Sequence, residues 1–413
     1  MSRLELIAGL DIGSSHVRMV VADMSTGEPN ILALSQVASE GVSKGVVTSI
    51  EDTVSTISLA REKAERMVGD QIQSVFVGIS GSHITSQISK GVIAVSRADG
   101  EINEEDVDRA LEAAQAVATP PNYEIIHVIP KHFTVDNQPW IKDPVGMTGR
   151  RLEVEAQIIQ GQTQQLKNLT KSVQRTGLGI NDVVLSILAS AEAVLTKRQK
   201  ELGVCVLNIG AATTGLIVFE EGDVMHTAII PVGSGHITAD LAIGLRTSID
   251  TAEKIKVEVG VATPTALDHD ETLDLSDFND AEQGEVVISH IAEIIEARIE
   301  EIFRLVDKEL NKIGRSGKLP AGIVITGGGA KLEGLLDLAK TEFRLPAQVG
   351  MPKGFISAIE KLNDPTLSTA VGLLRWGIIT DQKGESGSSS GGAPLFEGAI
   401  GSIKKLLKSL LPY

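Results

Sequence analysis

The sequence predicts an α/β protein with two lobes of similar build, and three observations support this prediction. The chain has 413 residues, which is more than one hydrophobic core usually supports. A strand–turn–strand pattern at residues 6–22 recurs at residues 204–219. A third turn, Gly327-Gly328-Gly329, joins an aliphatic strand to a helix, as is typical of α/β folds.

The two copies of the repeated pattern align without a gap. Their turns place LDIG (10–13) opposite LNIG (207–210), and an aliphatic strand follows each turn. We interpret the pattern as an internal repeat that gives the two lobes the same central hairpin. The alternative is a chance similarity between two short hairpins.

The stretch 83–160 differs from its surroundings, because it combines short strands with an acidic helix over 103–118 and Pro-rich turns. It reads as a small α+β unit inserted into the first lobe. Elsewhere the spacing of apolar residues predicts the remaining elements. We expect strands over 6–10, 17–22, 75–79, 204–207, 215–219 and 322–325, and helices over 51–68, 162–176, 186–198, 238–258, 284–313 and 366–380, with a further helix beginning at Ala330.

These elements divide the chain into two lobes and a tail. Lobe one comprises residues 1–82, 161–199 and 356–380, and carries the insertion; lobe two comprises residues 200–355. Residues 381–394 have the Gly/Ser-rich composition of a flexible linker. Residues 395–413 form an amphipathic segment.

Composition narrows the function classes. The formal net charge is -16, so a phosphate backbone would be repelled and nucleic-acid binding is not expected. The one cysteine, Cys205, lies in an aliphatic run and is expected to be an inert core residue of a protein in a reducing compartment. No zinc-binding spacing occurs, and no apolar run is long enough to span a bilayer.

The three turns carry the residue types that a nucleotide needs. Glycines let backbone N–H groups approach phosphates, hydroxyls add hydrogen bonds, and a carboxylate can hold Mg²⁺ through water. In the first turn Asp11 is the candidate for magnesium, and the third turn is expected at the adenosine. Taken singly, each turn could be an ordinary connection, and no P-loop is present. The candidate phosphate contacts are Gly13, Ser14, Ser15 and His16 in the first turn and Asn208, Gly210, Thr213 and Thr214 in the second.

The order and spacing of these turns resemble the phosphate-1, phosphate-2 and adenosine motifs of the actin, Hsp70 and sugar-kinase superfamily. Within it, segments along nearly the whole chain resemble the FtsA family of bacterial cell-division proteins. These segments are GLDIGSS (9–15), ISGSHI (79–84), HVIP (127–130), AEKIK (252–256), AGIVITGG (321–328) and TAVGLL (369–374).

The resemblance implies a two-lobed actin-like (duplicated ribonuclease H-like) ATPase fold with ATP and Mg²⁺ in the cleft, where Glu253 and Lys256 face the adenosine. It implies that the insertion at 83–160 serves self-association into filaments and contacts with later division proteins. It also implies that the outer part of lobe two, about 231–302, binds the C-terminal tail of FtsZ, the tubulin-like ring protein.

The second turn departs from the family pattern, in which two aspartates flank glycines. Asn208 and Gly215 stand at the aspartate positions, and Ala211 and Ala212 replace glycines. An amide cannot act as a general base. In the first turn His16 stands where members commonly carry lysine. We therefore expect nucleotide binding with weak or absent hydrolysis; the alternative is slow turnover supported by Asp11 and a water.

The tail has the pattern of a helix that lies in a membrane surface. Its apolar residues share one face and its three lysines lie on or beside the other, which suits the interface of an anionic leaflet. The alternative is a helix docked on the protein itself or on a partner. The apolar residues are Phe396, Ile400, Ile403, Leu406, Leu407, Leu410 and Leu411, and the lysines are Lys404, Lys405 and Lys408.

The sequence thus favours an adaptor that anchors the FtsZ ring to the cytoplasmic side of the cell membrane at the division septum. A pilus-assembly actin homologue would share the fold, although this linker and basic helix would be unusual there. A small-molecule kinase of the same superfamily would need a carboxylate beside the second turn, where Asn208 and Gly215 stand.

Overall fold

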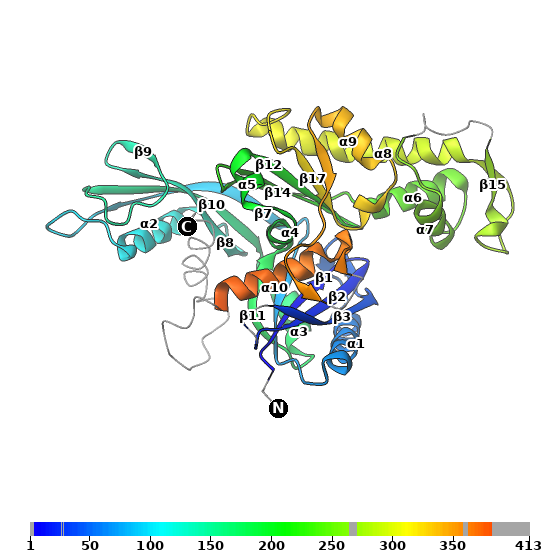
Figure 1. Cartoon of the computed structure of the whole chain (residues 1–413), viewed down its shortest axis with the longest axis horizontal. Helices are drawn as coiled ribbons and strands as arrows, with labels where there is room; N and C mark the ends of the chain where they lie inside the picture. Colours follow the sequence, from blue (N-terminus) through cyan, green and yellow to red (C-terminus); the bar gives the residue numbers. More distant parts are fainter. Residues whose placement is uncertain (1–3, 26, 28, 264–270, 358–361, 382–413) are drawn as a thin grey trace.

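The computed structural model describes residues 4–25, 27, 29–263, 271–357 and 362–381. The chain forms two lobes, and a third unit projects to the left in Figure 1. The predicted linker, beyond its first residue, and the predicted amphipathic tail lie outside the described residues.

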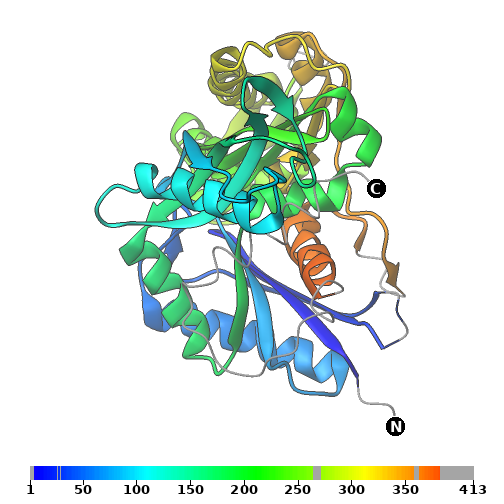
Figure 2. The ribbon, with the colours of Figure 1, turned by 90° about the vertical axis from the view of Figure 1, so that its left-hand side faces the viewer.

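Lobe one is built on a six-stranded sheet in the order β11-β6-β1-β2-β3-β19. Helices α1 and α10 lie on opposite faces of this sheet (Figure 2). Gly9 allows α10 to approach β1 closely, because a Cβ at this position would lie 2.4 Å from the Ala370 carbonyl oxygen. The elements of lobe one are β1 (Leu6–Ile12), β2 (His16–Asp23), β3 (Asn30–Ala38), α1 (Ile50–Val68), β6 (Ser74–Ile79), α3 (Thr163–Gln174), β11 (Gly179–Leu185), α4 (Ser186–Val194), β19 (Ile356–Ser357) and α10 (Ser368–Asp381), with a small hairpin of β4 (Val42–Ser43) and β5 (Val46–Val47).

Lobe two repeats this sheet. Its order β18-β17-β12-β13-β14 matches β11-β6-β1-β2-β3 strand for strand, with parallel pairs on one side of each central hairpin and antiparallel pairs on the other. The internal repeat is therefore a structural one, and the two-lobed prediction is confirmed. The strands are β12 (Val204–Ile209), β13 (Thr214–Glu220), β14 (Asp223–Ile230), β17 (Ile323–Thr326) and β18 (Ala347–Val349).

The helix expected over 238–258 is two helices. Arg246 adopts a left-handed conformation with φ of 55° and ends α6, and the Ser248 side chain then caps α7 by accepting from Thr251 N–H. The other helices and strands of lobe two are α6 (Ser234–Leu245), α7 (Ile249–Glu258), β15 (Thr272–Asp274), η2 (Leu275–Asp277), β16 (Glu285–Val287), α8 (Ile288–Lys312) and α9 (Leu335–Phe343).

Four other expected helices differ in their bounds. The helix over 186–198 stops at Val194, and Thr196 then opens the separate helix α5 (Lys197–Leu202) with a capping box to Gln199. The helix expected from 284 begins at Ile288, after the short strand β16. The helix expected from Ala330 begins at Leu335, because the 3-10 turn η3 (Gly328–Lys331) comes first, and the helix expected from 366 begins at Ser368, after the 3-10 turn η5 (Pro365–Leu367).

The inserted unit is a four-stranded sheet in the order β7-β10-β8-β9 with α2 on one face. Gly91 lets α2 lie directly on the sheet, because a Cβ there would lie 1.9 Å from the Ala110 carbonyl oxygen. The unit also touches lobe two, since Gln157 Nε2 donates to Thr227 Oγ1 at 3.0 Å. Its elements are β7 (Ile84–Ala94), α2 (Glu104–Ala118), β8 (Tyr123–Val135), β9 (Gln138–Ile141) and β10 (Arg151–Gln162).

The aliphatic core has two large parts. One fills lobe one and continues onto the face of the lobe-two sheet that packs against α4; the other lies between the opposite face of that sheet and helices α6, α8 and α9. Cys205 is fully buried in the second part, as expected, and burial raises the pKa of its thiol far above the usual range. Among the described residues, no helix combines the length and apolar character needed to cross a bilayer.

Candidate nucleotide-binding cleft

The three glycine turns line a single cavity of about 910 Å³ between the lobes. This volume lies at the upper end of the range that small-molecule sites usually occupy. Every nucleotide-site residue predicted from the sequence lines the cavity except Thr214. The lining residues among them are Asp11, Gly13, Ser14, Ser15, His16, Asn208, Gly210, Thr213, Glu253, Lys256, Gly327, Gly328 and Gly329.

The first two turns have the same backbone geometry. Gly13 N–H donates to the His16 carbonyl at 3.1 Å, and Gly210 N–H donates to the Thr213 carbonyl at 2.9 Å. The N–H groups at the tips, at Ser14 and Ser15 and at Ala211 and Ala212, make no hydrogen bond within the described part of the chain. Two equivalent turns thus present open donors to one cavity, which is an arrangement suited to a chain of phosphates.

Thr214 does not line the cavity. Its side chain is fully buried, and its hydroxyl donates to the Val232 carbonyl at 2.8 Å. The hydroxyl instead holds β13 against the segment that leads into α6. We therefore omit Thr214 from the proposed nucleotide contacts.

Asp11 and Arg18 are directly opposite each other on β1 and β2. Burial raises the pKa of Asp11 to about 6, although Arg18 opposes this shift. Arg18 lines the cavity, donates to Gln36 Oε1 at 3.2 Å, and lies within 4 Å of no carboxylate oxygen of the described residues. A cation without an ion pair at the cleft is suited to binding an anionic ligand.

His16 carries little positive charge at neutral pH. Burial and the nearby Arg18 lower its pKa, and its Nδ1 lies 2.8 Å from Ser15 Oγ. The positive charge beside the first turn therefore comes from Arg18. Arg18 was not among the residues predicted from the sequence, although β-strand alternation from His16 would have placed it on the same face of β2.

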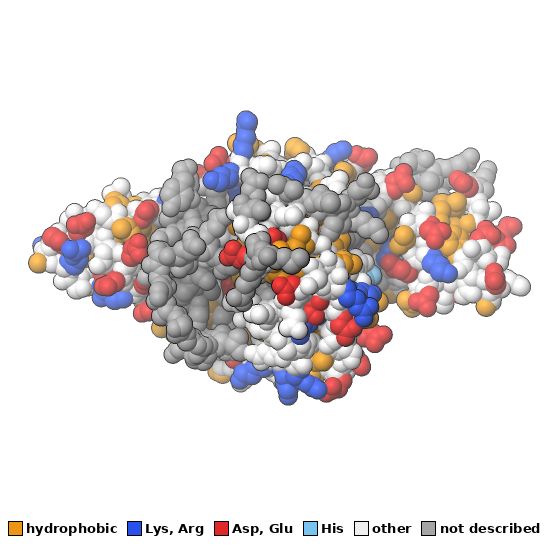
Figure 3. All heavy atoms as spheres, turned by 60° about the horizontal axis from the view of Figure 1, so that its bottom comes forward, with side chains coloured by type: hydrophobic (Ala, Val, Ile, Leu, Met, Phe, Trp, Pro, Cys, Tyr) orange, Lys and Arg blue, Asp and Glu red, His pale blue; other side chains and the backbone are white. Residues whose placement is uncertain are grey.

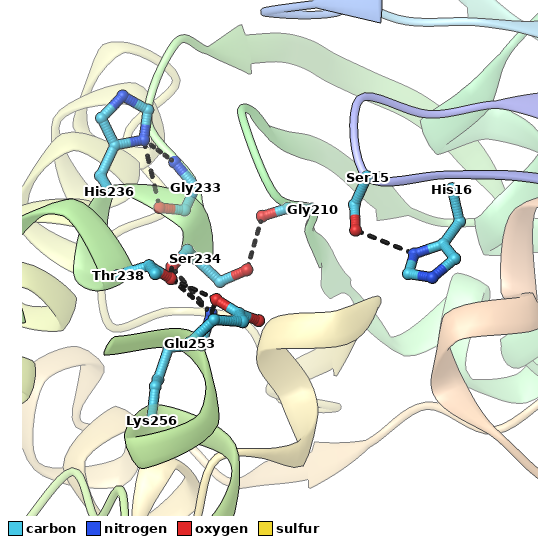
Figure 4. Close-up of polar contacts among 9 residues, drawn as sticks. All are labelled: Ser15, His16, Gly210, Gly233, Ser234, His236, Thr238, Glu253 and Lys256. Carbon is cyan, nitrogen blue, oxygen red and sulfur yellow. Dashed lines mark hydrogen bonds and ion pairs between the residues drawn. The ribbon is translucent and has the colours of Figure 1, made fainter. Parts of the chain in front are cut away.

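The second turn rests on the start of α6. Ser234 N–H and Ser234 Oγ both donate to the Gly210 carbonyl, at 2.8 and 3.1 Å (Figure 4). Glycine is required at 233, where a Cβ would lie 2.4 Å from the Gly210 carbonyl oxygen. This support fixes the turn relative to lobe two.

Lys256 and Glu253 project from α7 beside the same turn (Figure 4). Their ion pair measures 2.6 Å, and Lys256 Nζ also donates to Thr238 Oγ1 at 2.8 Å. The Lys256 side chain is only 10% exposed, whereas Glu253 is 50% exposed. Lys256 is thus held by protein partners, and Glu253 is the one of the two that offers a polar group to a ligand.

The third turn packs against the second. Gly327 has φ of 84°, and a Cβ there would lie 2.3 Å from Asn208 Oδ1. Nothing lies within 4 Å of the position that a Cβ on Gly328 would take, so this side of the turn is open. Beside it the Lys331–Asp364 ion pair of 2.6 Å lines the cavity, and neither residue was predicted from the sequence.

Asn208 lies at the floor of the cleft and is already hydrogen-bonded. Its Nδ2 donates to Ser190 Oγ at 2.9 Å and to Thr369 Oγ1 at 3.1 Å. Gly215 faces Ile187, with only 3.1 Å between its Cβ position and the isoleucine Cβ. Neither position offers a carboxylate for general-base chemistry.

Solved structures show the class of fold. PilM, in a PilM–PilN type IV pilus biogenesis complex, matches with a TM-score of 0.67 at 15% identity, over 90% of this chain and 98% of that one. MreB5 of Spiroplasma citri bound to ADP matches with a TM-score of 0.56 at 13% identity, over 93% and 99%. With the duplicated sheets and the cleft between them, these likenesses define a two-lobed actin-like protein.

Sequence comparisons narrow the class to a family. The model described as "SHS2 domain inserted in FTSA" matches residues 81–160, and the model "Cell division protein FtsA" matches residues 205–372. Cell division protein FtsA of Pseudomonas aeruginosa is 39% identical over 94% of this chain and 93% of that protein. The Escherichia coli K12 protein of the same name is 34% identical over 92% of each. The chain belongs to the FtsA family of cell-division proteins, and the inserted unit is its SHS2 subdomain.

Proposed function

We propose that this protein binds ATP with Mg²⁺ in the cleft, assembles into actin-like filaments, and anchors the FtsZ ring to the cytoplasmic face of the cell membrane at the septum. The observation that carries the proposal is the convergence of three glycine turns on one cavity in a chain of the FtsA family. Other features of the chain support the separate parts of this proposal, which are nucleotide binding, the FtsZ contact and membrane attachment.

In the cleft, the open N–H groups of the first two turns hold the phosphates, and Arg18 supplies positive charge. Mg²⁺ usually binds through substrate phosphates, a few waters and one or two carboxylates. Asp11 lines the cavity and would accept hydrogen bonds from such waters. The open third turn and Glu253 take the adenosine. Asn208 cannot accept a proton from water as a carboxylate does, so hydrolysis is slow or absent.

The outer part of lobe two is the proposed site for the C-terminal tail of FtsZ. Figure 3 shows hydrophobic side chains among acidic ones at this end of the molecule, on the right of the view. Ile243 on α6 is 78% exposed and Ile249 on α7 is 56% exposed. These side chains offer an apolar contact for a short peptide segment.

Membrane attachment is proposed for the amphipathic tail, and the SHS2 subdomain is proposed to contact neighbouring copies and later division proteins. Each lysine near an anionic surface contributes about 1 kcal/mol, and folding of the helix offsets part of the apolar gain. One tail should therefore bind reversibly. A filament that presents many tails binds strongly through avidity, so assembly controls attachment.

One experiment tests the assembly proposal. Full-length protein is applied to monolayers of anionic lipid with and without Mg²⁺ and ATP, and filaments are scored by electron microscopy while phosphate release is measured in the same sample. We expect nucleotide-dependent filaments with little phosphate released. Absence of any nucleotide effect on binding or assembly would contradict the proposal.

A further inference from the structure

Ser190, Asn208 and Thr369 form a hydrogen-bonded group, the interlobe cluster, at the floor of the cleft. Asn208 and Thr369 line the cavity, and Ser190 lies behind them. Asn208 belongs to β12 of lobe two, Ser190 to α4 and Thr369 to α10. Ser190 and Thr369 are 0% and 4% exposed, and their hydroxyl oxygens lie 3.0 Å apart. The two contacts of Asn208 join residues 18 and 161 positions away in the chain.

The geometry assigns each proton in the cluster. Ser190 O–H donates to the Ser186 carbonyl at 2.8 Å, so Ser190 Oγ can only accept from its other neighbours. Thr369 O–H then donates to Ser190 Oγ, and the two N–H groups of Asn208 go to the two hydroxyl oxygens. All four protons have an acceptor. A side chain at 208 that lacked N–H groups could not complete this arrangement.

The cluster lies where the lobes meet. Helices α4 and α10 cross in close contact, because a Cβ on Gly372 would lie 1.9 Å from the Ala189 carbonyl oxygen. These helices therefore have little freedom to shift against each other. Asn208, near the end of β12, connects lobe two to both helices through its hydrogen bonds. The next residue, Ile209, packs against the third turn at Gly329.

We propose that the interlobe cluster sets the angle between the lobes, and thereby holds the three glycine turns at the spacing that a nucleotide needs. Asn208 is then a positioning residue that acts through Ser190 and Thr369, and its amide is what the cluster requires. This inference rests on the proposed nucleotide site.

Ser190→Ala tests the proposal without touching the cleft, because Ser190 does not line the cavity. Ser172→Ala is a matched control: Ser172 is also fully buried in a helix, and its hydroxyl donates to the carbonyl four residues earlier, at 2.9 Å. The full chain is titrated with a fluorescent ATP analogue in the presence of Mg²⁺. We expect Ser190→Ala to weaken binding by about three- to tenfold, the effect of one or two neutral hydrogen bonds, and Ser172→Ala to leave it unchanged.

Thr369 supplies a second variant. Thr369→Val removes the hydroxyl with little change of shape and should weaken binding of the ATP analogue. Thr369→Ser keeps the hydroxyl and should retain most of the affinity of the unaltered protein. In an Asn208→Ala background, Ser190→Ala should add little, because its partner is already gone. Additive losses in this cycle, or equal affinity for Ser190→Ala and Ser172→Ala, would overturn the proposal.

Hydrogen exchange of the nucleotide-free chain separates this inference from the proposed function. Ser190→Ala should speed exchange along α4, α10 and β12, and Ser172→Ala should not. If the unaltered protein binds no nucleotide, the proposed cleft function fails, while the exchange comparison still decides whether the cluster joins the lobes. Unchanged exchange in Ser190→Ala would overturn the proposal that the cluster joins the lobes.

Discussion

Asp11 and Arg18 line the same cavity, and the charge of Asp11 depends on the pH near neutrality. Burial raises the pKa of Asp11 from 3.8 to about 6, so its carboxylate form is present above about pH 6 and is lost below it. Burial and the nearby Arg18 lower the pKa of His16 from its usual value, so His16 loses its charge at a lower pH than a free imidazole does. Asp11 is the carboxyl group of the cleft whose charge changes near pH 6.

Binding of ATP with Mg²⁺ should accordingly weaken as the pH falls through about 6. Protonated Asp11 cannot accept hydrogen bonds from magnesium-bound water with the strength of a carboxylate. Affinity is measured at saturating Mg²⁺ from about pH 5 to about pH 8, with Asn at position 11 (Asp11→Asn) as the control. The control should be weak and independent of pH in this range. The same pH dependence in both proteins would show that another group titrates.

Arg18 should contribute to ATP affinity through the phosphates alone. Hydrogen bonds to charged groups contribute about 1.5–3 kcal/mol, so Arg18→Ala should weaken ATP by about ten- to a hundredfold. Arg18→Lys keeps the charge and should lose less. Competition with adenosine provides the control, because it lacks phosphates and should bind both variants like the unaltered protein. Equal losses for adenosine and ATP would place Arg18 outside the phosphate site.

Asn208→Asp should raise phosphate release. The substitution returns a general base to the cleft floor, and positioned bases contribute about 10²–10⁴-fold to rates. Some of that gain will be missing, because the carboxylate disturbs the hydrogen bonds to Ser190 and Thr369. Single-turnover phosphate release measures the effect, and Asn208→Ala should show no increase. An unchanged rate in Asn208→Asp would indicate that Asp11 and a water carry the residual turnover.

At the residue scale, local patterns located the turns but not the partners of their side chains. The glycine and hydroxyl residues that line the cavity follow from turn chemistry. The hydroxyls that hold Asn208 come from two distant helices, and no local pattern connects them. Thr214 was misplaced because it opens β13, where its side chain points into the core rather than the cavity.

At the scale of elements, hydrophobic periodicity found most helices and strands but missed where helices break. Residues 238–258 keep an apolar face through Arg246, and only the left-handed backbone there and the Ser248 cap divide α6 from α7. An arginine with positive φ gives no signal in the sequence. The break after Val194 was signalled more clearly, because Thr196 and Gln199 have the spacing of a capping box.

The tail is the proposed membrane anchor, and paired substitutions test this proposal. Leu407→Glu with Leu410→Glu places two charges on its apolar face and should release the protein from anionic vesicles, with the core still folded. Ser402→Glu with Ser409→Glu adds the same charge outside the apolar face that the sequence predicts and is the matched control. Vesicle flotation measures binding and circular dichroism checks folding. Equal release by both pairs would mean that charge alone governs attachment, and retention of the leucine pair would remove the anchor proposal.

At the scale of the whole molecule, the duplication could be predicted from the sequence because both sheets keep the same central hairpin. The LDIG and LNIG turns lie at matching positions of β1 and β12. The contact of the SHS2 subdomain with lobe two could not be predicted from the sequence. The subdomain leaves the chain of lobe one near residue 83 and returns near 161, so sequence order gives no hint that it also reaches β14.

This contact braces one lobe against the other. Lys142 Nζ lies 3.2 Å from Asp223 Oδ2, and Gln157 Nε2 donates to Thr227 Oγ1 where both residues are nearly fully buried. Because the subdomain is covalently part of lobe one, any change in the angle between the lobes must act on these bonds. A change in this angle on nucleotide binding should therefore be transmitted to the surface of the subdomain.

A charge exchange tests the brace. Lys142→Glu should repel Asp223 and speed hydrogen exchange along β14, and Lys142→Glu with Asp223→Lys should restore protection. The pair is partly exposed, at 40% and 24%, so it contributes about 1 kcal/mol at most, and the increase should be about fivefold or less. Gln157→Ala should add to it, since it removes a buried hydrogen bond. Failure of the reversed pair to restore protection, with the fold intact, would show that Lys142 and Asp223 are only neighbours and that β14 is held by packing alone.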